Sequence, residues 1–200
     1  MRRLIACFVF ALGGLSPVLA FDAQTEDVLS RLKVGKLVPI ADIGTLMMAS
    51  ERWCYLEDQG TCVLTDIYLD VTKAGATFEI GNAWNQDYNV MFTDSGTFED
   101  GRYICETGAD WVPTVRAERR SDGSSVGGRE LARLKDEIAA GRSNATIDCF
   151  DYVLKDFDEN AKTIKLLQRQ FTDGLTDETN DVLVTLHFDA EEAAALTWAY

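Results

Sequence analysis

The ten residues WCYLEDQGTC, at positions 53–62, decide the fold of this chain. Cys54 and Cys62 lie on either side of a polar turn, and residues 63–71 then alternate in the manner of a half-buried antiparallel strand. We interpret the stretch as a β-hairpin that a disulfide bond clamps. The same alternation of apolar and polar residues, with a period of two, recurs through most of the later chain. We therefore expect a β-rich domain built onto this hairpin.

The N-terminus determines whether those cysteines can be oxidised. Two arginines precede an apolar run at 4–15, which is too short to span a bilayer, and Val18-Leu19-Ala20 provides the small residues that signal peptidase requires. We therefore predict a cleaved signal peptide at 1–20. The mature chain would begin at Phe21 and reside in the periplasm or outside the cell, without inserting into a membrane.

Cleavage leaves an even number of cysteines, which in an exported chain is typical of disulfide pairing. The short spacing favours Cys54–Cys62, and this leaves Cys105–Cys149 as the second bridge. With the thiols committed and His187 the single histidine of the sequence, thiol catalysis and multi-histidine metal sites are not expected.

The charge of the chain excludes two classes of partner. Loss of Arg2 and Arg3 reduces the 19 basic residues to 17, against 33 acidic ones, which gives a net charge of −16. Nucleic acids and anionic membrane surfaces both attract basic proteins. We expect a soluble acidic protein that binds neither.

Elements can be placed along the chain from periodicity and turn residues. A helix is expected at 25–33, whereas 36–50 suits either a helix from Asp42 or a strand. Asp100-Gly101 is a type I′ turn signal that joins 97–99 to 102–105, and Ser95-Gly96 is interpreted as a bulge. Further strands are expected at 78–80, 88–92, 146–157, 163–171 and 182–188, and Asp189 begins a short terminal helix.

Residues 114–142 differ in composition from their surroundings, with more basic than acidic side chains. A polar loop is followed there by a helix with Leu131, Leu134 and Ile138 on one side. The predicted fold class is thus α+β and β-rich: an antiparallel meander or barrel-like sheet with an N-terminal helix, a mid-chain covering helix and a short C-terminal helix. Residues 21–200 form a single domain, from which 114–142 is an exposed excursion.

One motif suggests a serine hydrolase. Residues 123–127, GSSVG, match the nucleophile elbow G-x-S-x-G, and Ser125, Asp177 and His187 follow in the chain order of the α/β-hydrolases. The elbow must follow a buried parallel strand, however, and the preceding residues 116–120 are too charged to be buried on both faces. The hydrolase remains an alternative and not the leading hypothesis.

Carboxylates offer a second alternative, calcium binding, because calcium takes six to eight oxygen ligands. Two acidic turns could supply several of them, although neither has EF-hand spacing. The residues concerned are Asp156, Asp158, Glu159 and Asn160 in one turn, and Asp173, Asp177, Glu178, Asn180 and Asp181 in the other.

The leading hypothesis is an exported, soluble, non-catalytic binding or interaction domain without a cofactor. Trp84, Asn85 and Tyr88 combine aromatic rings with an amide, as sugar-binding surfaces do. Together with the 114–142 excursion they are the candidate contact region for a protein or a glycan. A serine hydrolase and a calcium-stabilised structural protein are the alternatives.

Overall fold

A computed structural model of the protein describes residues 21–108, 111–141 and 147–200. The predicted signal peptide lies outside the described residues, as does part of the loop after the mid-chain helix. None of the helices in the described ranges combines the length and apolar character that a membrane span requires.

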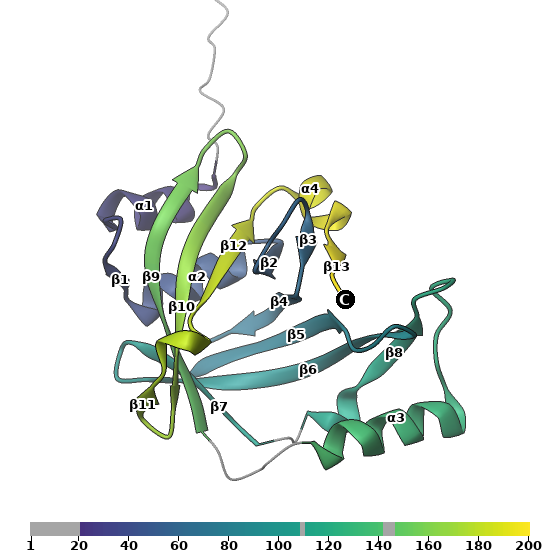
Figure 1. Ribbon diagram of the computed structural model, residues 1–200. Coiled ribbons are helices and arrows are strands. Elements are labelled where there is room, and N and C mark those ends of the chain that lie inside the picture. Colours follow the sequence, from purple (N-terminus) through teal and green to yellow (C-terminus); the bar gives the residue numbers. More distant parts are fainter. Residues whose placement is uncertain (1–20, 109–110, 142–146) are drawn as a thin grey trace, which may run out of the picture.

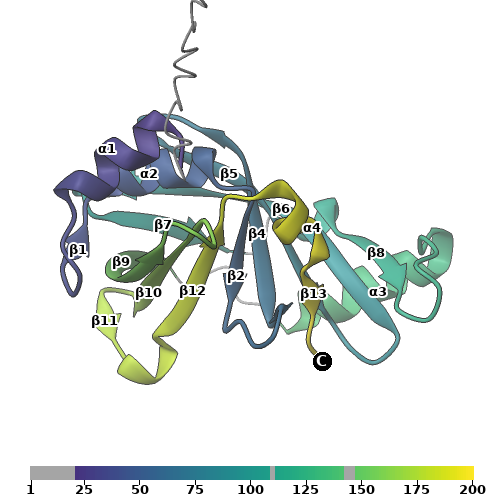
Figure 2. The ribbon, with the colours of Figure 1, turned by 90° about the horizontal axis from the view of Figure 1, so that it is seen from above.

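The sheet closes on itself as a barrel of eight antiparallel strands (Figures 1 and 2). Neighbouring strands pair in the order β9-β7-β6-β5-β4-β2-β12-β10, and β10 pairs again with β9. The strands of this ring are β2 (Arg52–Tyr55), β4 (Leu64–Val71), β5 (Gly75–Ala83), β6 (Tyr88–Glu99), β7 (Tyr103–Thr107), β9 (Ile147–Asp158), β10 (Thr163–Thr172) and β12 (Val182–His187). The predicted β-rich, barrel-like fold class is confirmed.

Smaller elements decorate the ring. The helices of the described chain are α1 (Ala23–Arg31), α2 (Ile40–Ala49), α3 (Gly128–Ala140) and α4 (Ala190–Ala195), with 3₁₀ turns η1 (Val112–Thr114) and η2 (Glu178–Asn180). Short strands are β1 (Leu37–Val38), β3 (Thr61–Cys62), β8 (Arg116–Arg119), β11 (Leu175–Thr176) and β13 (Thr197–Trp198). In Figures 1 and 2, α1 and α2 lie together on one side, and α3 lies beyond β8 on the other.

The opening stretch is a hairpin of β2 and β4. Cys54 pairs with Thr65 across it, and the Cys54–Cys62 disulfide ties β2 to the connection that precedes β4. Within the connection, Asp58 and Thr61 exchange backbone hydrogen bonds, which forms the tight turn that the sequence predicted.

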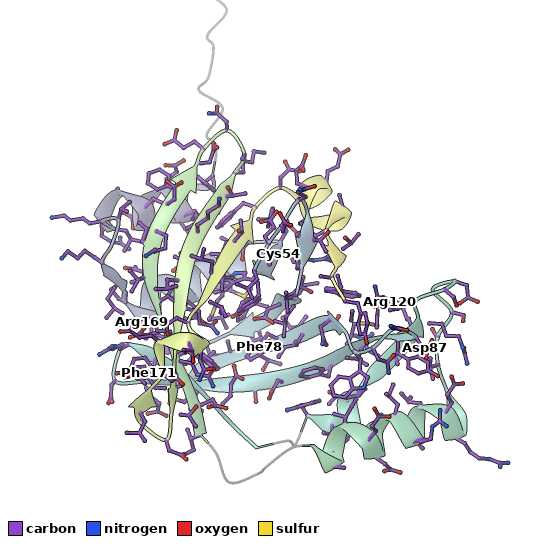
Figure 3. All side chains as sticks on the ribbon, in the orientation of Figure 1. Cys54, Phe78, Asp87, Arg120, Arg169 and Phe171 are labelled. Carbon is purple, nitrogen blue, oxygen red and sulfur yellow. A yellow bond between two sulfur atoms is a disulfide. The ribbon has the colours of Figure 1, made fainter. Side chains whose placement is uncertain are left out.

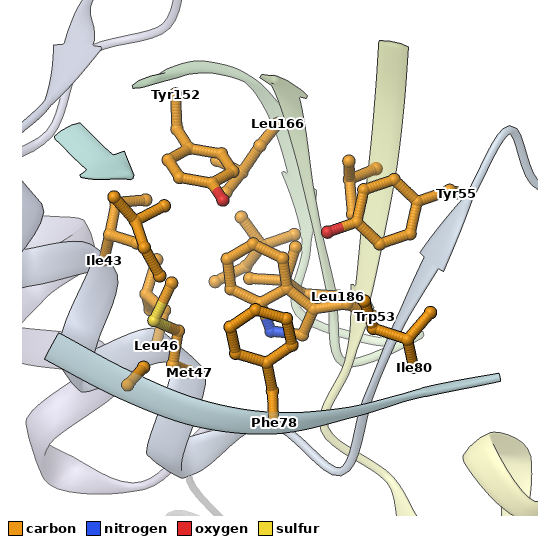
Figure 4. Packing of buried hydrophobic residues seen from close by; sticks show 14 of the residues in the cluster. Ile43, Leu46, Met47, Trp53, Tyr55, Phe78, Ile80, Tyr152, Leu166 and Leu186 are labelled. Atoms are coloured by element: carbon orange, nitrogen blue, oxygen red, sulfur yellow. The ribbon is translucent and has the colours of Figure 1, made fainter. Parts of the chain in front are cut away.

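The segment at 36–50, which the sequence left undecided, is mainly helical. Pro39 is the N-cap of α2, where its fixed φ suits the entry of the chain and its missing N–H is not needed. Ile43, Leu46 and Met47 then project from one side of α2 and are fully buried at one end of the barrel. Figure 4 shows them facing Phe78 and Tyr152 across this core.

The inner and outer faces of the barrel follow from strand register. One face of β4 carries Leu64, Asp66 and Tyr68. These residues pair with or flank the inward-facing residues of β5, so this face of β4 points into the barrel. Val63 and Leu69, on the face with the more continuous apolar pattern, are 51% and 52% exposed. A register shift between Tyr68 and Asp70 then brings Val71 against the core.

Two local expectations were wrong. Ser95-Gly96 forms no bulge, because β5 and β6 pair continuously from Gly75 to Ala83. A Cβ on Gly96 would lie 2.5 Å from Ile104, so glycine is needed there for close approach of the neighbouring strand and not for a kink. The loop before α3 is also not fully exposed, since Arg116–Arg119 pairs with β6 as β8.

The charged residues of β8 suit a strand because each of its faces offers a carboxylate partner. Arg116 forms an ion pair with Glu79 of β5, Arg119 forms one with Glu130 of α3, and Ala117 between them is buried. The predicted helix is α3, whose Leu134 and Ile138 are buried against this part of the sheet.

The C-terminal part follows the sequence prediction closely. The β9–β10 hairpin and β12 form as expected, and the Asp189 carboxylate accepts hydrogen bonds from the N–H groups of Glu191 and Glu192 as the N-cap of α4. Beyond α4, an unpredicted strand β13 pairs in parallel with β3. It places Trp198 on the outside of the barrel, where a Cβ on Gly81 would collide with the indole at 2.4 Å.

The second predicted disulfide, Cys105–Cys149, joins residues that lie directly opposite each other on β7 and β9. Its closed loop is the longer of the two, with a sequence separation of 44 against 8 for Cys54–Cys62. Both bridges are consistent with an oxidising compartment.

Removal of the long-loop disulfide should destabilise the protein by about 4 kcal/mol, because the unfolded chain regains the entropy of a long loop. We expect Cys105→Ala, Cys149→Ala and the double variant to lose similar amounts of unfolding free energy in urea titrations, since each breaks the same bond. Losses that add in the double variant would show that the two side chains contribute independently and not through a bridge.

Candidate functional site

Seven inward-facing residues form what we call the acid–tyrosine cluster: Tyr55, Asp66, Tyr68, Asp94, Glu106, Asp148 and Tyr152. Strand register places the side chain of each of them on the inner face of the barrel. The cluster extends toward the end opposite α2, whereas the apolar residues of α2 close the other end. The inside of the barrel thus combines an apolar core with inward-facing acids.

Asp66 is the most deeply buried acid of the cluster, with a solvent exposure of 4%. Tyr55 donates a hydrogen bond to Oδ2 of Asp66 at 2.5 Å, and the same hydroxyl lies 3.2 Å from the side-chain amide oxygen of Gln168. The other oxygen, Oδ1, is buried and accepts no hydrogen bond from the described residues. A buried acceptor without a donor is unfavourable, by about 1–3 kcal/mol.

The protonation of Asp66 reflects this environment. Burial raises the pKa of Asp66 from its ordinary 3.8 to about 7, the hydrogen bond from Tyr55 opposes the rise, and the charge of Asp94 adds to it. Asp66 therefore changes charge near neutral pH, which an exposed aspartate does not.

Three tyrosines surround the acids with hydroxyl groups and rings. Burial, together with nearby acidic and phenolic groups, raises the pKa of Tyr55, Tyr68 and Tyr152 well above 10. Trp53 packs edge-on against two of them, with ring centroids 5.0 Å from Tyr68 and 5.5 Å from Tyr152. Figure 4 shows the hydroxyls of Tyr55 and Tyr152 pointing toward the middle of the barrel.

The remaining acids lie on β6, β7 and β9. Burial and the charges of Asp94, Asp66 and Asp148, in that order, raise the pKa of Glu106 well above its ordinary value. Asp148 is held in place, because its Oδ1 accepts hydrogen bonds from Gln170 at 3.0 Å and Thr172 at 2.6 Å. The four carboxyl groups thus influence one another electrostatically inside one barrel.

Solvent reaches this part of the inner wall. Tyr68, Asp94, Glu106 and Asp148 all face inward, yet each is only half-buried. At the same end, Trp111 stacks on the inward-facing Phe92, with ring centroids 3.9 Å apart. These inward-facing side chains are therefore accessible at this end of the barrel.

Both disulfides lie on the outer wall directly behind this cluster. Cys54 precedes Tyr55 on β2, Cys105 precedes Glu106 on β7, and Cys149 follows Asp148 on β9. Neighbouring residues of a strand point to opposite faces, so each bridge fixes a backbone that carries an inward-facing cluster residue.

The surface residues that the sequence singled out as contacts are engaged within the protein. Trp84 packs against the core, and Oδ1 of Asn85 accepts hydrogen bonds from the N–H groups of Asp87 and Tyr88 at 2.9 Å each. The hydroxyl of Tyr88 donates to Glu130 of α3 at 2.7 Å. These residues anchor the turn before β6 to α3. Figure 3 shows Asp87 and Arg120 in this region, far from Cys54.

The residues of the hypothetical catalytic triad do not form a hydrogen-bonded chain. Ser125 is exposed and bridges to Glu118, and Asp177 accepts hydrogen bonds from the backbone and hydroxyl of Thr179. The segment between β8 and α3, which carries Ser125, lies well apart from β12, which carries His187, in Figures 1 and 2. The geometry gives the hydrolase alternative no support.

His187 instead lies on the outer face of the barrel at a groove of about 820 Å³. Its Nε2 is 3.1 Å from Oε2 of Glu57, and the residue as a whole is 7% exposed. Cys54, Glu57 and His187 are the one group of potential metal ligands that lie close together in the described ranges. The Cys54 sulfur is bonded to Cys62, so it is not a thiolate and this group is not a metal site.

The two acidic turns have local structural roles. Oδ1 of Asp158 accepts hydrogen bonds from the N–H groups of Asn160 and Ala161, and Asp173 accepts one from the N–H of Ile147. These contacts stabilise the turns by themselves. The calcium hypothesis gains no converging set of oxygens from them.

The sequence reasoning missed the acid–tyrosine cluster. Acids that point into a barrel alternate along a strand in the same way as acids on its solvent-facing side, so the sequence pattern does not distinguish them. A usable signal was present: Asp94 and Glu106 each lie two residues after a buried apolar residue, Phe92 and Ile104, on a period-two strand. Acids in phase with the core-facing positions indicate a polar interior.

Comparisons with known proteins leave this geometry as the basis for function. No protein-family model, no curated protein and no solved structure matches this chain.

Replacement of Asp66 by asparagine should stabilise the protein at high pH. The unfolded state releases the Asp66 proton near pH 3.8 and the folded state near pH 7, so the stability of the wild type falls as pH rises between these values. Above pH 7 the ionised Asp66 costs on the order of 2–4 kcal/mol. We expect Asp66→Asn to exceed the wild type by about this amount in urea titrations at pH 8, and by much less at pH 5.

The matched control is Asp70→Asn, on the same strand but exposed. It should change stability little at either pH. An Asp66→Asn variant that is equally destabilised at both values would contradict the assignment of Asp66 as a buried acid with a raised pKa.

Proposed function

We propose that this protein is an exported, non-catalytic binding domain, and that its ligand site is the acid–tyrosine cluster inside the barrel. The observation that carries the proposal is the buried, unpartnered Oδ1 of Asp66 on an inner wall that solvent reaches. A folded protein gains nothing in stability from such a group, whereas a ligand that supplies a donor would satisfy it.

The arrangement also has the rigidity that a binding site needs. Cluster residues project from paired strands and not from loops, and hydrogen bonds hold Asp66 to Tyr55 and Asp148 to Gln170 and Thr172. Two disulfides brace the wall behind them. A preorganised site of this kind loses little entropy when a ligand binds.

Export is supported by independent features of the chain. The predicted signal peptide, the two disulfides and the acidic composition all agree with a periplasmic or secreted protein. The non-catalytic assignment is part of the proposal, and its support is that the cluster consists of acids and tyrosines, without a serine, cysteine or lysine nucleophile among its seven residues.

The proposal can be tested by a thermal-shift screen of the oxidised protein against small metabolites of cationic, neutral and anionic classes. Compounds that raise the melting temperature should do so less in Tyr55→Phe, which lacks the hydroxyl that donates to Asp66. They should act undiminished on Tyr88→Phe, whose hydroxyl contacts Glu130 at the surface.

Three results would count against the proposal. Stabilising compounds that act equally on Tyr55→Phe would place the site elsewhere, and dependence on Tyr88 would favour the surface turn. Turnover of any compound by the pure protein would remove the non-catalytic assignment.

A further inference from the structure

We infer that a groove between α2 and the ends of β4 and β6 binds a single-chain amphiphile with an anionic head, of which a long-chain carboxylate is the simplest example. The groove has a volume of about 840 Å³, which is within the range of sites that hold small organic ligands. None of the seven residues of the acid–tyrosine cluster lines it. It is therefore a second site, and the inference does not rest on the binding function proposed above.

The helix wall of the groove is apolar. The core-facing residues of α2 point into the barrel (Figure 4), whereas Ala41, Thr45 and Met48 line the groove on another side of the same helix. Met48 is 54% exposed, and the hydroxyl of Thr45 donates to the backbone oxygen of Ala41, so its hydrogen is already used. A helix that is apolar on more than its core side has a second surface that gains from being covered.

The sheet completes the floor. A Cβ on Gly44 would lie 3.3 Å from Cγ1 of Val71 and 3.5 Å from the ring of Phe98, so glycine allows α2 to approach the ends of β4 and β6 closely. Val71 and Phe98 are only half-buried, and both line the groove together with α2. A hydrocarbon chain that lies on this surface would bind up to about fourfold more tightly for each methylene that it buries.

The charges at the rim indicate the head group. Lys73, in the exposed turn between β4 and β5, is the one cation among the described residues that line the groove, and it forms no ion pair with any described residue. Asp22 is the one acid of the lining, and its carboxylate is engaged as the N-cap of α1, where it accepts hydrogen bonds from the N–H groups of Gln24 and Thr25. The helix N-terminus offsets the charge of Asp22, which leaves the positive charge of Lys73 available to a ligand.

The two features together distinguish the occupant from simpler ones. A small anion would leave the apolar floor uncovered, a neutral apolar compound would leave Lys73 without a partner, and a cationic amphiphile would place like charges side by side. A chain with a carboxylate at one end satisfies both the floor and the lysine. The net charge of −14 repels anions at long range, so the affinity must come from the buried chain and the adjacent ammonium group.

The test is isothermal titration calorimetry of the oxidised protein at pH 8 with decanoate, decanol, decyltrimethylammonium and hexanoate, each below the concentration at which it forms micelles. We expect decanoate to bind at least about tenfold more tightly than hexanoate, because it has four more methylenes to bury. It should bind about three- to fivefold more tightly than decanol, which is the contribution of one exposed ion pair, and decyltrimethylammonium should bind least.

Variants locate the two parts of the site. Lys73→Gln should remove the preference for decanoate over decanol, whereas Lys155→Gln, which changes an exposed lysine outside the groove, should preserve it. Ala41→Phe should obstruct the groove and weaken both decanoate and decanol by about tenfold or more, as several methylenes lose their contacts. Its matched control is Ala132→Phe, at an exposed position of α3.

Met48→Gln is a second groove variant at an exposed position, and it should weaken both ligands without adding bulk. The melting temperature of every variant is measured, so that a loss of binding is counted only for a folded protein. Equal affinity for decanoate and decanol in the wild type would overturn recognition of the anionic head. Decanoate binding that survives both Ala41→Phe and Met48→Gln would place the chain elsewhere, and absence of decanoate binding would overturn the inference outright. None of these results affects the site inside the barrel, which Tyr55→Phe tests.

Discussion

The pairing of β12 with β2 is the constraint on which the rest of the structure depends. It joins Val184–His187 to Arg52–Tyr55 and so turns an open antiparallel sheet into a ring. Once the ring is closed, each strand must direct every second side chain inward, whatever its chemistry. The acids on β4, β6, β7 and β9 are directed inward by that geometric necessity, and closure therefore determines both the stability of the core and the polarity of the site.

The apolar and the acidic side chains of the interior serve different purposes. Near α2, apolar residues such as Ile43 and Met47 fill the barrel and supply the burial that stabilises the fold. Asp66 and Glu106, by contrast, are kept inside at the expense of stability, since burial raises the pKa of both. A chain of this size can tolerate such inward-facing acids because its apolar core and two disulfides stabilise it independently.

Sequence reasoning predicted what local patterns determine. The hairpin at 53–62, the turn at Asp100-Gly101, the cap at Asp189 and the barrel-like sheet each follow from periodicity, turn chemistry or capping. It could not predict which face of β4 points inward, because Val63 and Leu69 continue an apolar pattern while Asp66 does not. That choice depends on the register with β5, a long-range property of the closed ring, and the acid–tyrosine cluster was hidden for the same reason.

The docking of β13 on β3 has a consequence for the order in which the chain matures. Backbone N–H groups of Thr197 and Ala199 donate to Gly60 and Cys62, and both sulfur-bearing residues of the short bridge, Cys54 and Cys62, have no exposed surface in the folded protein. Thiol–disulfide exchange requires access to sulfur. An oxidase must therefore reach Cys54 and Cys62 before the last residues of the chain dock. After docking, the short bridge is sealed, whereas the half-buried Cys105–Cys149 bridge stays within reach of a reductant.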